Sequence, residues 1–235
     1  MESSLSKRAA VIDTIPTVFG YLGIASAFGV IARSTGFSTI TVIMMSIIIY
    51  AGSAQFTTVS MLVAGSPIAS IIFTTFMVNS RMILMSTTVA PYFKKDKLGK
   101  GILIGTLLTD DSFALAMNKL NFTNDKMNFS WFNTENMISY KTWVFATAIG
   151  AILGNFIKDP KQLGLDFANV AMFIGLLYLQ VNNDKSLNKL LQVIVILLTM
   201  LLTYILTMIL PPSMVIIVVT LIGCALGMVI KRVFF

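Results

Sequence analysis

The chain has 235 residues, of which 56% are hydrophobic and only 11% are charged, and its mean hydropathy is +0.86. Soluble domains carry about 25% charged residues, so this sequence cannot cover a water-facing surface of ordinary size, and we expect lipid to surround most of it. The formal net charge of +7 is spread between apolar runs, which excludes the clustered basic face of a nucleic-acid-binding protein and is typical of loops that flank membrane helices.

The apolar runs predict an all-α, polytopic integral membrane protein with seven to eight transmembrane segments in one domain, residues 1–235. A spanning helix needs about 20 mostly apolar residues. The candidate segments are residues 15–32, 39–63, 68–89, 101–117, 142–157, 167–181, 190–210 and 215–230. The longest polar stretch, residues 118–141, is predicted to hold a short interfacial element around Trp131 and Phe132, because aromatic side chains favour that depth.

The basic residues predict that one segment is broken or re-entrant. Lys7 and Arg8 precede the first segment, and a second basic loop, residues 94–100, follows the third. The positive-inside rule places both in the cytoplasm, which three simple crossings between them forbid. Either the chain violates the rule, or the second or third segment fails to cross. Residues 50–55 (Tyr-Ala-Gly-Ser-Ala-Gln), with small side chains and a buried amide, are the candidate break.

Glycine positions suggest a degenerate internal repeat and close helix contacts. Residues 23–37 are similar to residues 150–165, and transporters are often built from repeats. Chance similarity between two glycine-containing apolar helices is the alternative. GxxxG spacing, which allows helices to approach closely, occurs at Gly101/Gly105, Gly150/Gly154 and Gly223/Gly227.

Arg81 lies deep within the third segment, in the apolar surroundings of residues 76–84. A charge at mid-bilayer costs roughly 2.5–3.5 kcal/mol on insertion scales, so this residue needs an explanation. Two remain open. Arg81 binds a substrate carboxylate, or it forms a buried ion pair that locks two helices together, and one ion pair could do both.

Asp110 and Asp111 follow Thr109 in the middle of the fourth segment. Neighbouring residues point about 100° apart on a helix, so we expect one carboxyl to pair with Arg81 and the other to line a cavity. A carboxyl in a low-dielectric site is able to load and unload a proton, which makes both aspartates candidate proton-coupling residues. The alternative is that Thr109 begins a broken helix whose N-terminus the two acids occupy.

Four polar or small residues complete the predicted substrate site. Gly52 and Ser53 lie in the candidate break, and Gln55 and Asn79 are amides at membrane depth. We interpret all four as candidate substrate-binding residues. For the two amides, hydrogen bonding between helices is the commoner fate.

Two further aspartates lie at the edges of apolar runs. Asp166 is a candidate proton-coupling residue, although an N-cap at the membrane edge is the favoured interpretation. Asp13, which precedes Thr14 and Pro16, is also predicted to be an N-cap.

Several kinds of chemistry are excluded. The sequence has no histidine, so His-ligated metal sites and His-based acid–base catalysis are absent. It has no Walker A motif, and its polar residues form no recognisable nucleophile–base set. We therefore expect no enzymatic activity, no metal and no cofactor.

Four motifs occur in an order that is similar to one known family. They are Tyr50-Ala51-Gly52-Ser53-Ala54-Gln55-Phe56, then Asn79-Ser80-Arg81, then Thr109-Asp110-Asp111-Ser112-Phe113-Ala114, and finally Leu165-Asp166-Phe167-Ala168 followed by Phe173-Ile174. In these positions the chain resembles the AzlC family, the large subunits of branched-chain amino acid exporters. Family members often carry Leu-Arg where this chain has Ser80-Arg81.

The resemblance implies a secondary exporter of branched-chain amino acids in a bacterial cytoplasmic membrane, working with a small companion subunit of the AzlD type. Our hypothesis is that helices broken near Gly52-Ser53 and near Asp110 present free amides to the substrate zwitterion. Protonation of Asp110 or Asp111 would couple export to the proton gradient. The alternatives are a transporter or channel for another small organic solute, and a membrane scaffold whose buried charges only hold helices together.

Overall fold

The computed structural model describes residues 5–124, 126–157, 187–210 and 212–234, together with 167, 170, 174–175, 177–178 and 181–182 between them. These residues form helices and turns without strands, as predicted. The helices are α1 (Lys7–Ser34), α2 (Thr39–Ile48), α3 (Gly52–Val63), α4 (Ile68–Asn79), α5 (Arg81–Val89), η2 (Ala90–Phe93), α6 (Leu98–Leu107), α7 (Asp110–Phe122), α8 (Phe129–Leu153), α10 (Lys189–Thr207) and α11 (Pro212–Phe234).

Three of the described helical stretches are long and apolar enough to cross a membrane: Lys7–Ser34, Ile68–Phe93 and Lys189–Thr207. The second combines α4, α5 and η2, which follow one another with an interruption at Ser80. The total of seven to eight spans stays a prediction.

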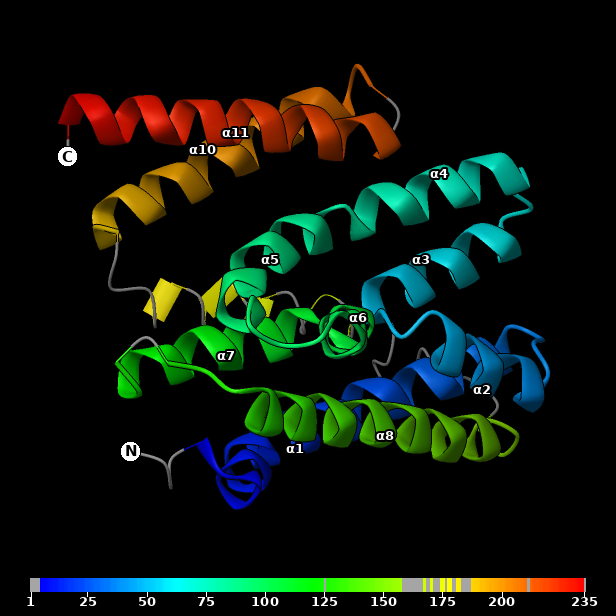
Figure 1. The fold of residues 1–235 in the computed structure, drawn as a ribbon. Helices are drawn as coiled ribbons and strands as arrows, with labels where there is room; N and C mark the ends of the chain where they lie inside the picture. Colours follow the sequence, from blue (N-terminus) through cyan, green and yellow to red (C-terminus); the bar gives the residue numbers. More distant parts are fainter. Residues whose placement is uncertain are drawn as a thin grey trace.

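The first and eighth helices lie side by side and run in the same direction (Figure 1). Hydrogen bonds along the length of both helices tie α1 and α8, or the residues that flank them, together. Among them are Asn128 Nδ2 to the Leu5 carbonyl, Ser26 Oγ to the Ala146 carbonyl, and Arg33 Nε to Asn155 Oδ1. The paired residues are 123, 120 and 122 positions apart. A constant sequence separation along two helices requires that they be parallel.

Glycines bring these two helices into backbone contact. A Cβ atom on Gly29 would overlap the backbone of Thr147 and Ala151, and one on Gly150 would overlap the backbone of Ser26. The predicted close approach at Gly150 is therefore confirmed.

The other two predicted glycine pairs have different outcomes. Gly223 and Gly227 face Thr199 and Val195, so the pair lies at the α10–α11 contact as expected. The prediction was wrong for Gly101 and Gly105. Within the described part of the chain, a Cβ on either would meet nothing within 4 Å.

The prediction for the start of α8 was also wrong. The helix begins at Phe129 instead of residue 142, and Trp131 and Phe132 are 0% exposed instead of interfacial. Its buried side chains recur about every four residues, at the period of a helix face. They include Trp131, Glu135, Ser139, Trp143, Thr147 and Ala151. Protein surrounds this face, so its polar residues do not meet lipid.

The predicted second segment is a helical hairpin that turns back on itself. α2 ends at Ile48, and the chain reverses through Tyr50, whose φ of +39° lies in the left-handed region. Val42 of α2 and Val59 of α3 share one buried cluster with Phe28 in the C-terminal half of α1. Both arms therefore lie beside the same half of α1. The predicted break is confirmed between α2 and α3, at residues 49–51, whereas residues 52–55 form the first turn of α3.

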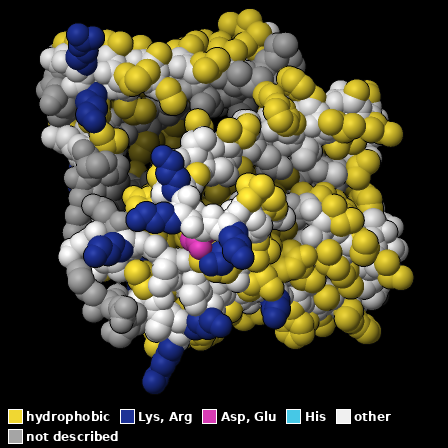
Figure 2. Space-filling model, viewed as in Figure 1, with side chains coloured by type: hydrophobic (Ala, Val, Ile, Leu, Met, Phe, Trp, Pro, Cys, Tyr) yellow, Lys and Arg dark blue, Asp and Glu magenta, His cyan; other side chains and the backbone are white. Residues whose placement is uncertain are grey.

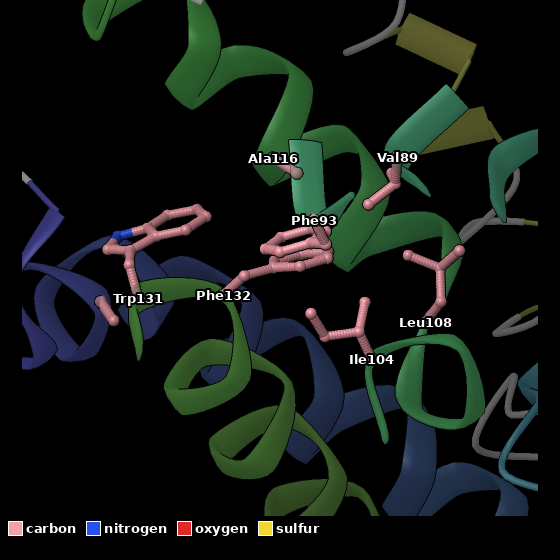
Figure 3. Packing of buried hydrophobic residues seen from close by; sticks show 8 residues of the cluster. Val89, Phe93, Ile104, Leu108, Ala116, Trp131 and Phe132 are labelled. Carbon is pink, nitrogen blue, oxygen red and sulfur yellow. The ribbon is translucent and has the colours of Figure 1, made fainter. Parts of the chain in front are cut away.

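The predicted fourth segment is a second hairpin at the opposite end of α1. α6 and α7 are separated by extended backbone at Leu108 and Thr109. Ile104 of α6 and Ala116 of α7 share a cluster with Ala10, near the start of α1. Figure 3 shows the same cluster, in which the ring of Phe93 stacks on Phe132 with centroids 5.8 Å apart.

The two hairpins place the basic segments at one end of the molecule. Between the N-terminus and the basic loop 94–100, only α1 and the α4–α5 stretch cross from end to end, because the α2–α3 hairpin returns to its side of entry. The start of α10 and the end of α11 also lie at this end (Figure 1). Lys and Arg side chains gather on the same half of the visible face, and hydrophobic side chains cover the other half (Figure 2). The conflict with the positive-inside rule disappears.

Candidate functional site

Three interruptions of helical structure converge in the interior. They are the tip of the α2–α3 hairpin, the α4–α5 junction at Ser80, and the tip of the α6–α7 hairpin. A small cavity lies between them, with a volume of about 20 Å³, which is room for about one water molecule. It is lined by Tyr21, Tyr50, Ala51, Gly52, Ser53, Arg81, Met82, Thr109, Asp110, Asp111 and Trp143.

Arg81 joins the two hairpins. Its Nη2 atom lies 2.7 Å from Asp110 Oδ2 on α7 and donates to Ser53 Oγ on α3 at 3.0 Å. The Asp110 side chain is 13% exposed and that of Arg81 is 32% exposed. The prediction that one of the two aspartates pairs with Arg81 is confirmed, and the charge of each partner is compensated.

The tip of the second hairpin is a capped helix N-terminus. Thr109 Oγ1 accepts from the Ser112 amide at 3.2 Å, and Ser112 Oγ accepts from the Thr109 amide at 2.9 Å. Asp110 and Asp111 occupy the first turn of α7, where a helix dipole stabilises negative charge. The interpretation of these residues as a broken helix start is correct, and it places both acids at the cavity.

The two carboxyls point to different partners, as the helix geometry predicts. Asp110 meets Arg81, whereas Asp111 lies beside the Tyr21 hydroxyl. That hydroxyl is also 3.1 Å from Thr109 Oγ1. Asp111 has no cation within salt-bridge distance in the described part of the chain.

The tip of the first hairpin is an uncapped helix N-terminus. No side chain caps α3, and its first backbone bond runs from the Gln55 amide to the Ala51 carbonyl at 2.9 Å. The amides of the preceding residues, Gly52 and Ser53 among them, are first-turn donors that the helix itself does not use. Gly52 packs against the indole of Trp143, because a Cβ there would lie 2.7 Å from Trp143 Cη2.

Gln55 was predicted to bind substrate, but it does not line the cavity. Its Oε1 accepts from Trp143 Nε1 at 2.9 Å, and its Nε2 donates to Ser46 Oγ at 2.8 Å. Ser46 in turn donates to Thr147 Oγ1 at 2.8 Å. Gln55 thus follows the alternative interpretation, since both ends of its amide join α3 to neighbouring helices.

Two other predicted residues are not part of the cavity wall. Asn79 is one position before the α4–α5 junction and does not line the cavity. Its Oδ1 atom is buried without a hydrogen-bond partner among the described residues. Asp166 lies outside the described residues.

Asp13 is not an N-cap. α1 begins six residues earlier, at Lys7, with Ser6 as its cap. Asp13 accepts from Lys119 Nζ at 2.6 Å and from Trp131 Nε1 at 2.8 Å, so it joins α1 to α7 and α8.

Sequence reasoning missed several aromatic and acidic side chains around the cavity. Tyr21, Tyr50 and Trp143 line it, and Glu135 is buried on α8 near Tyr50. A signal existed for α8, because its polar and aromatic residues recur every four positions through a stretch of low hydropathy.

The comparisons with known proteins fit this arrangement. The "AzlC protein" family matches residues 16–157, a segment that holds every residue of the cavity wall. The chain is 31% identical over 179 residues to "Inner membrane protein YgaZ" of Escherichia coli, covering 74% of this chain and 73% of that protein.

Two more relatives are similar. Identity to "Branched-chain amino acid transport protein AzlC" of Bacillus subtilis is 33% over 168 residues, 71% of this chain and 65% of that protein. Identity to an "Uncharacterized membrane protein" of Archaeoglobus fulgidus is 31% over 180 residues, 74% and 77% of the two chains. No solved structure matches.

Proposed function

The chain belongs to the AzlC family of membrane transport proteins, and from this premise we propose that it is a secondary transporter that exports branched-chain amino acids with the help of the proton gradient. The observation that carries the proposal is the bridge from Arg81 to Ser53 and Asp110. It places a cation, two helix N-termini and two carboxyls around one buried point. An amino acid zwitterion requires these opposite charges side by side.

The substrate carboxylate binds on the α3 side of this site. Arg81 offers a guanidinium that matches a carboxylate in two-point geometry, and the free first-turn amides of α3 add donors at the positive end of a helix. Ser53 already holds Arg81 in place from this helix. The substrate carboxylate therefore competes with Asp110 for the guanidinium.

The substrate ammonium binds on the α7 side. Asp111 lacks a cation partner in the described part of the chain and faces the same cavity as Arg81. A proton that binds Asp110 would remove its charge and release Arg81 to the substrate. Proton uptake at Asp110 and carboxylate binding at Arg81 then favour each other, which is the coupling that a proton-driven exporter needs.

In this proposal the structure corresponds to a closed form of the substrate site. A cavity of about 20 Å³ holds one water molecule and is too small for a leucine side chain. The hairpin tips must separate for a substrate to enter, and Met82 and Trp143 supply apolar surface for its side chain. Since the hairpins enter from opposite ends, displacement of one tip opens the site to one side only, as alternating access requires.

The distribution of charge supports an orientation. Lys and Arg side chains gather on one half of the visible face (Figure 2), the half on which α1 starts (Figure 1), and the positive-inside rule places this end in the cytoplasm. The α6–α7 hairpin then lies on the cytoplasmic side and the α2–α3 hairpin on the outer side. We place the protein in a bacterial cytoplasmic membrane with a companion subunit of the AzlD type, as the family resemblance implies.

Counter-flow of labelled leucine into proteoliposomes tests the proposal. The vesicles contain unlabelled valine or isoleucine, with and without the companion subunit and with and without a pH gradient. Uptake that depends on internal substrate and changes with the gradient is expected. Absence of counter-flow from folded protein in every condition would overturn it, and flux that rises linearly with concentration without counter-flow would indicate a channel.

A further inference from the structure

Glu135 is a buried acid that the proposed substrate site does not use. It lies in α8, and its side chain is 0% exposed. One carboxyl oxygen, Oε1, accepts from Ser139 Oγ one turn later at 2.9 Å. The other, Oε2, is buried and has no hydrogen-bond partner among the described residues.

No cation pairs with this carboxyl among the described residues, where the three ion pairs all involve other acids. Lys119 pairs with Asp13, and Lys100 pairs with Asp96. Arg81 pairs with Asp110 at the cavity, whose wall does not include Glu135. An ionised carboxyl in such a place is expensive, because it has lost its water without gaining a counter-charge.

The titratable groups that face Glu135 come from three other elements. They are Tyr21 of α1, Tyr50 between α2 and α3, and Asp111 of α7. None of these carries a positive charge, and Asp111 adds a negative one when it is ionised. Among these neighbours no cation opposes a proton on Glu135, and Asp111 favours one.

Tyr50 connects this carboxyl with the substrate site. Its ring packs edge-on against Tyr140 with centroids 4.8 Å apart, and it lines the cavity. Its hydroxyl is buried near Tyr21 and Glu135 without a hydrogen bond of ordinary geometry to any described residue. The backbone of Tyr50 is in the left-handed region, with φ +39°, which is costly for an aromatic residue.

We propose that Glu135 is a second proton-binding site of this carrier, distinct from the Arg81–Asp110 ion pair, and that Tyr50 transmits its state to the tip of the α2–α3 hairpin. The step is the addition of one proton from water to Oε2 and its later release, with no other bond formed or broken. When Oε2 carries the proton, Glu135 is too weak a hydrogen-bond acceptor to move the Tyr50 hydroxyl, and the backbone of Tyr50 stays as it is. With the proton off, the carboxylate draws the Tyr50 hydroxyl toward it as a donor, and the hairpin tip shifts.

The effect of Glu135 on transport rests on the proposed function, but the first test detects proton binding alone and needs no transport. Infrared difference spectroscopy of the purified full-length protein in lipid, titrated across neutral pH, detects the carbonyl stretch of a protonated carboxyl. A band that changes with pH is expected in the wild type, absent from Glu135→Gln and shifted in Glu135→Asp. Asp96→Asn, which removes a surface carboxyl that pairs with Lys100, is the matched control and should keep the band.

The second test is transport. Leucine exchange by Glu135→Gln should keep the part of its pH dependence that Asp110 supplies and lose the rest, and accumulation driven by a pH gradient should fall below that of the wild type. An infrared band unchanged in Glu135→Gln, or gradient-driven accumulation by it that equals that of the wild type, would overturn the proposal. Loss of all leucine exchange in a folded Glu135→Gln protein, with exchange restored by Glu135→Asp, would overturn the distinction from the substrate site. A wild type with the band but without leucine transport would refute the proposed function alone.

Discussion

The two hairpins meet at the same point but present opposite chemistry. The α2–α3 tip ends in an uncapped helix, with the small residues Gly52 and Ser53 first and no acid in its first turn. The α6–α7 tip ends in a helix capped by Thr109 and carries Asp110 and Asp111 in its first turn. One tip offers hydrogen-bond donors and the other offers negative charge.

Under the proposed function, this difference explains how a low-charge membrane protein would build a site for a zwitterion. Each tip alone would bind ions of one sign at membrane depth, at a high cost in lipid. Arg81 from a third element compensates the acidic tip and is held by the neutral tip, 2.7 Å from Asp110 and 3.0 Å from Ser53. The charges stabilise one another in the closed structure and, under the proposed function, become available when the site opens.

The largest effect is expected from removing the residue that joins the two tips. Arg81→Met leaves Asp110 buried without its cation, which should abolish leucine counter-flow and lower the free energy of unfolding by about 3 kcal/mol. Counter-flow and thermal unfolding in detergent measure the two consequences. The control is Arg81→Met with Asp110→Leu, which removes both charges.

The double variant distinguishes a transporter, in which Arg81 binds substrate, from a scaffold, in which the ion pair only holds helices together. If the ion pair only holds helices together, the uncharged pair should restore stability and activity alike. We expect it to recover most of the stability without any counter-flow. Full activity in the double variant would contradict the assignment of Arg81 to the substrate carboxylate.

Asp111→Asn tests the acidic tip without breaking the ion pair. Asp111 has no described cation partner, so its loss should leave stability near that of the wild type. If it binds the substrate ammonium, loss of a charged hydrogen bond worth about 1.5 kcal/mol should raise the apparent KM for leucine about tenfold. Initial rates of counter-flow over a range of leucine concentrations measure this, with Asp96→Asn as the control, and an unchanged KM would exclude that role.

The two tips also show what the sequence can predict. Both breaks were visible, because glycine, serine and aspartate interrupt apolar runs at residues 50–55 and 109–112. The Arg81–Asp110 pair followed from the cost of unpaired charge in lipid. At the first tip, a re-entrant segment was one of the predicted alternatives, because the basic residues forbid three simple crossings. At the second tip the reversal was not visible, because it depends on contacts between its arms and α1 that are distant in sequence.

The remaining differences have the same origin. Gln55 was recognised as a buried amide, but its partner Trp143 is 88 residues away. Asp13 looked like a local cap, whereas its partners are 106 and 118 residues away. The start of α8 was hidden because the helix is buried by protein, so its mean hydropathy does not mark it as a span.

A smaller effect is expected at the neutral tip. Gly52→Ala places a methyl group 2.7 Å from Trp143 Cη2, and the indole cannot move without breaking its bond to Gln55. We expect a loss of about 2 kcal/mol in unfolding free energy and a strong fall in counter-flow, measured as above. Gly23→Ala in α1 is the matched control, since a Cβ there meets nothing within 4 Å. Equal behaviour of the two variants would contradict tight packing at this tip.

The smallest effect distinguishes positioning from binding at the same tip. Gln55→Leu leaves the Trp143 indole N–H and the Ser46 hydroxyl without their partner, which should cost about 1 kcal/mol of stability. Because Gln55 lies behind the cavity wall, the maximal rate should fall as the α3 tip loosens, while the apparent KM for leucine stays near the wild-type value. Thr147→Val removes only the hydroxyl that accepts from Ser46, at the far end of this hydrogen-bond series, and should show a weaker form of the same change. A selective rise of KM in Gln55→Leu would instead place the amide in contact with substrate, and the neutral tip would then supply a side chain as well as its backbone to the site.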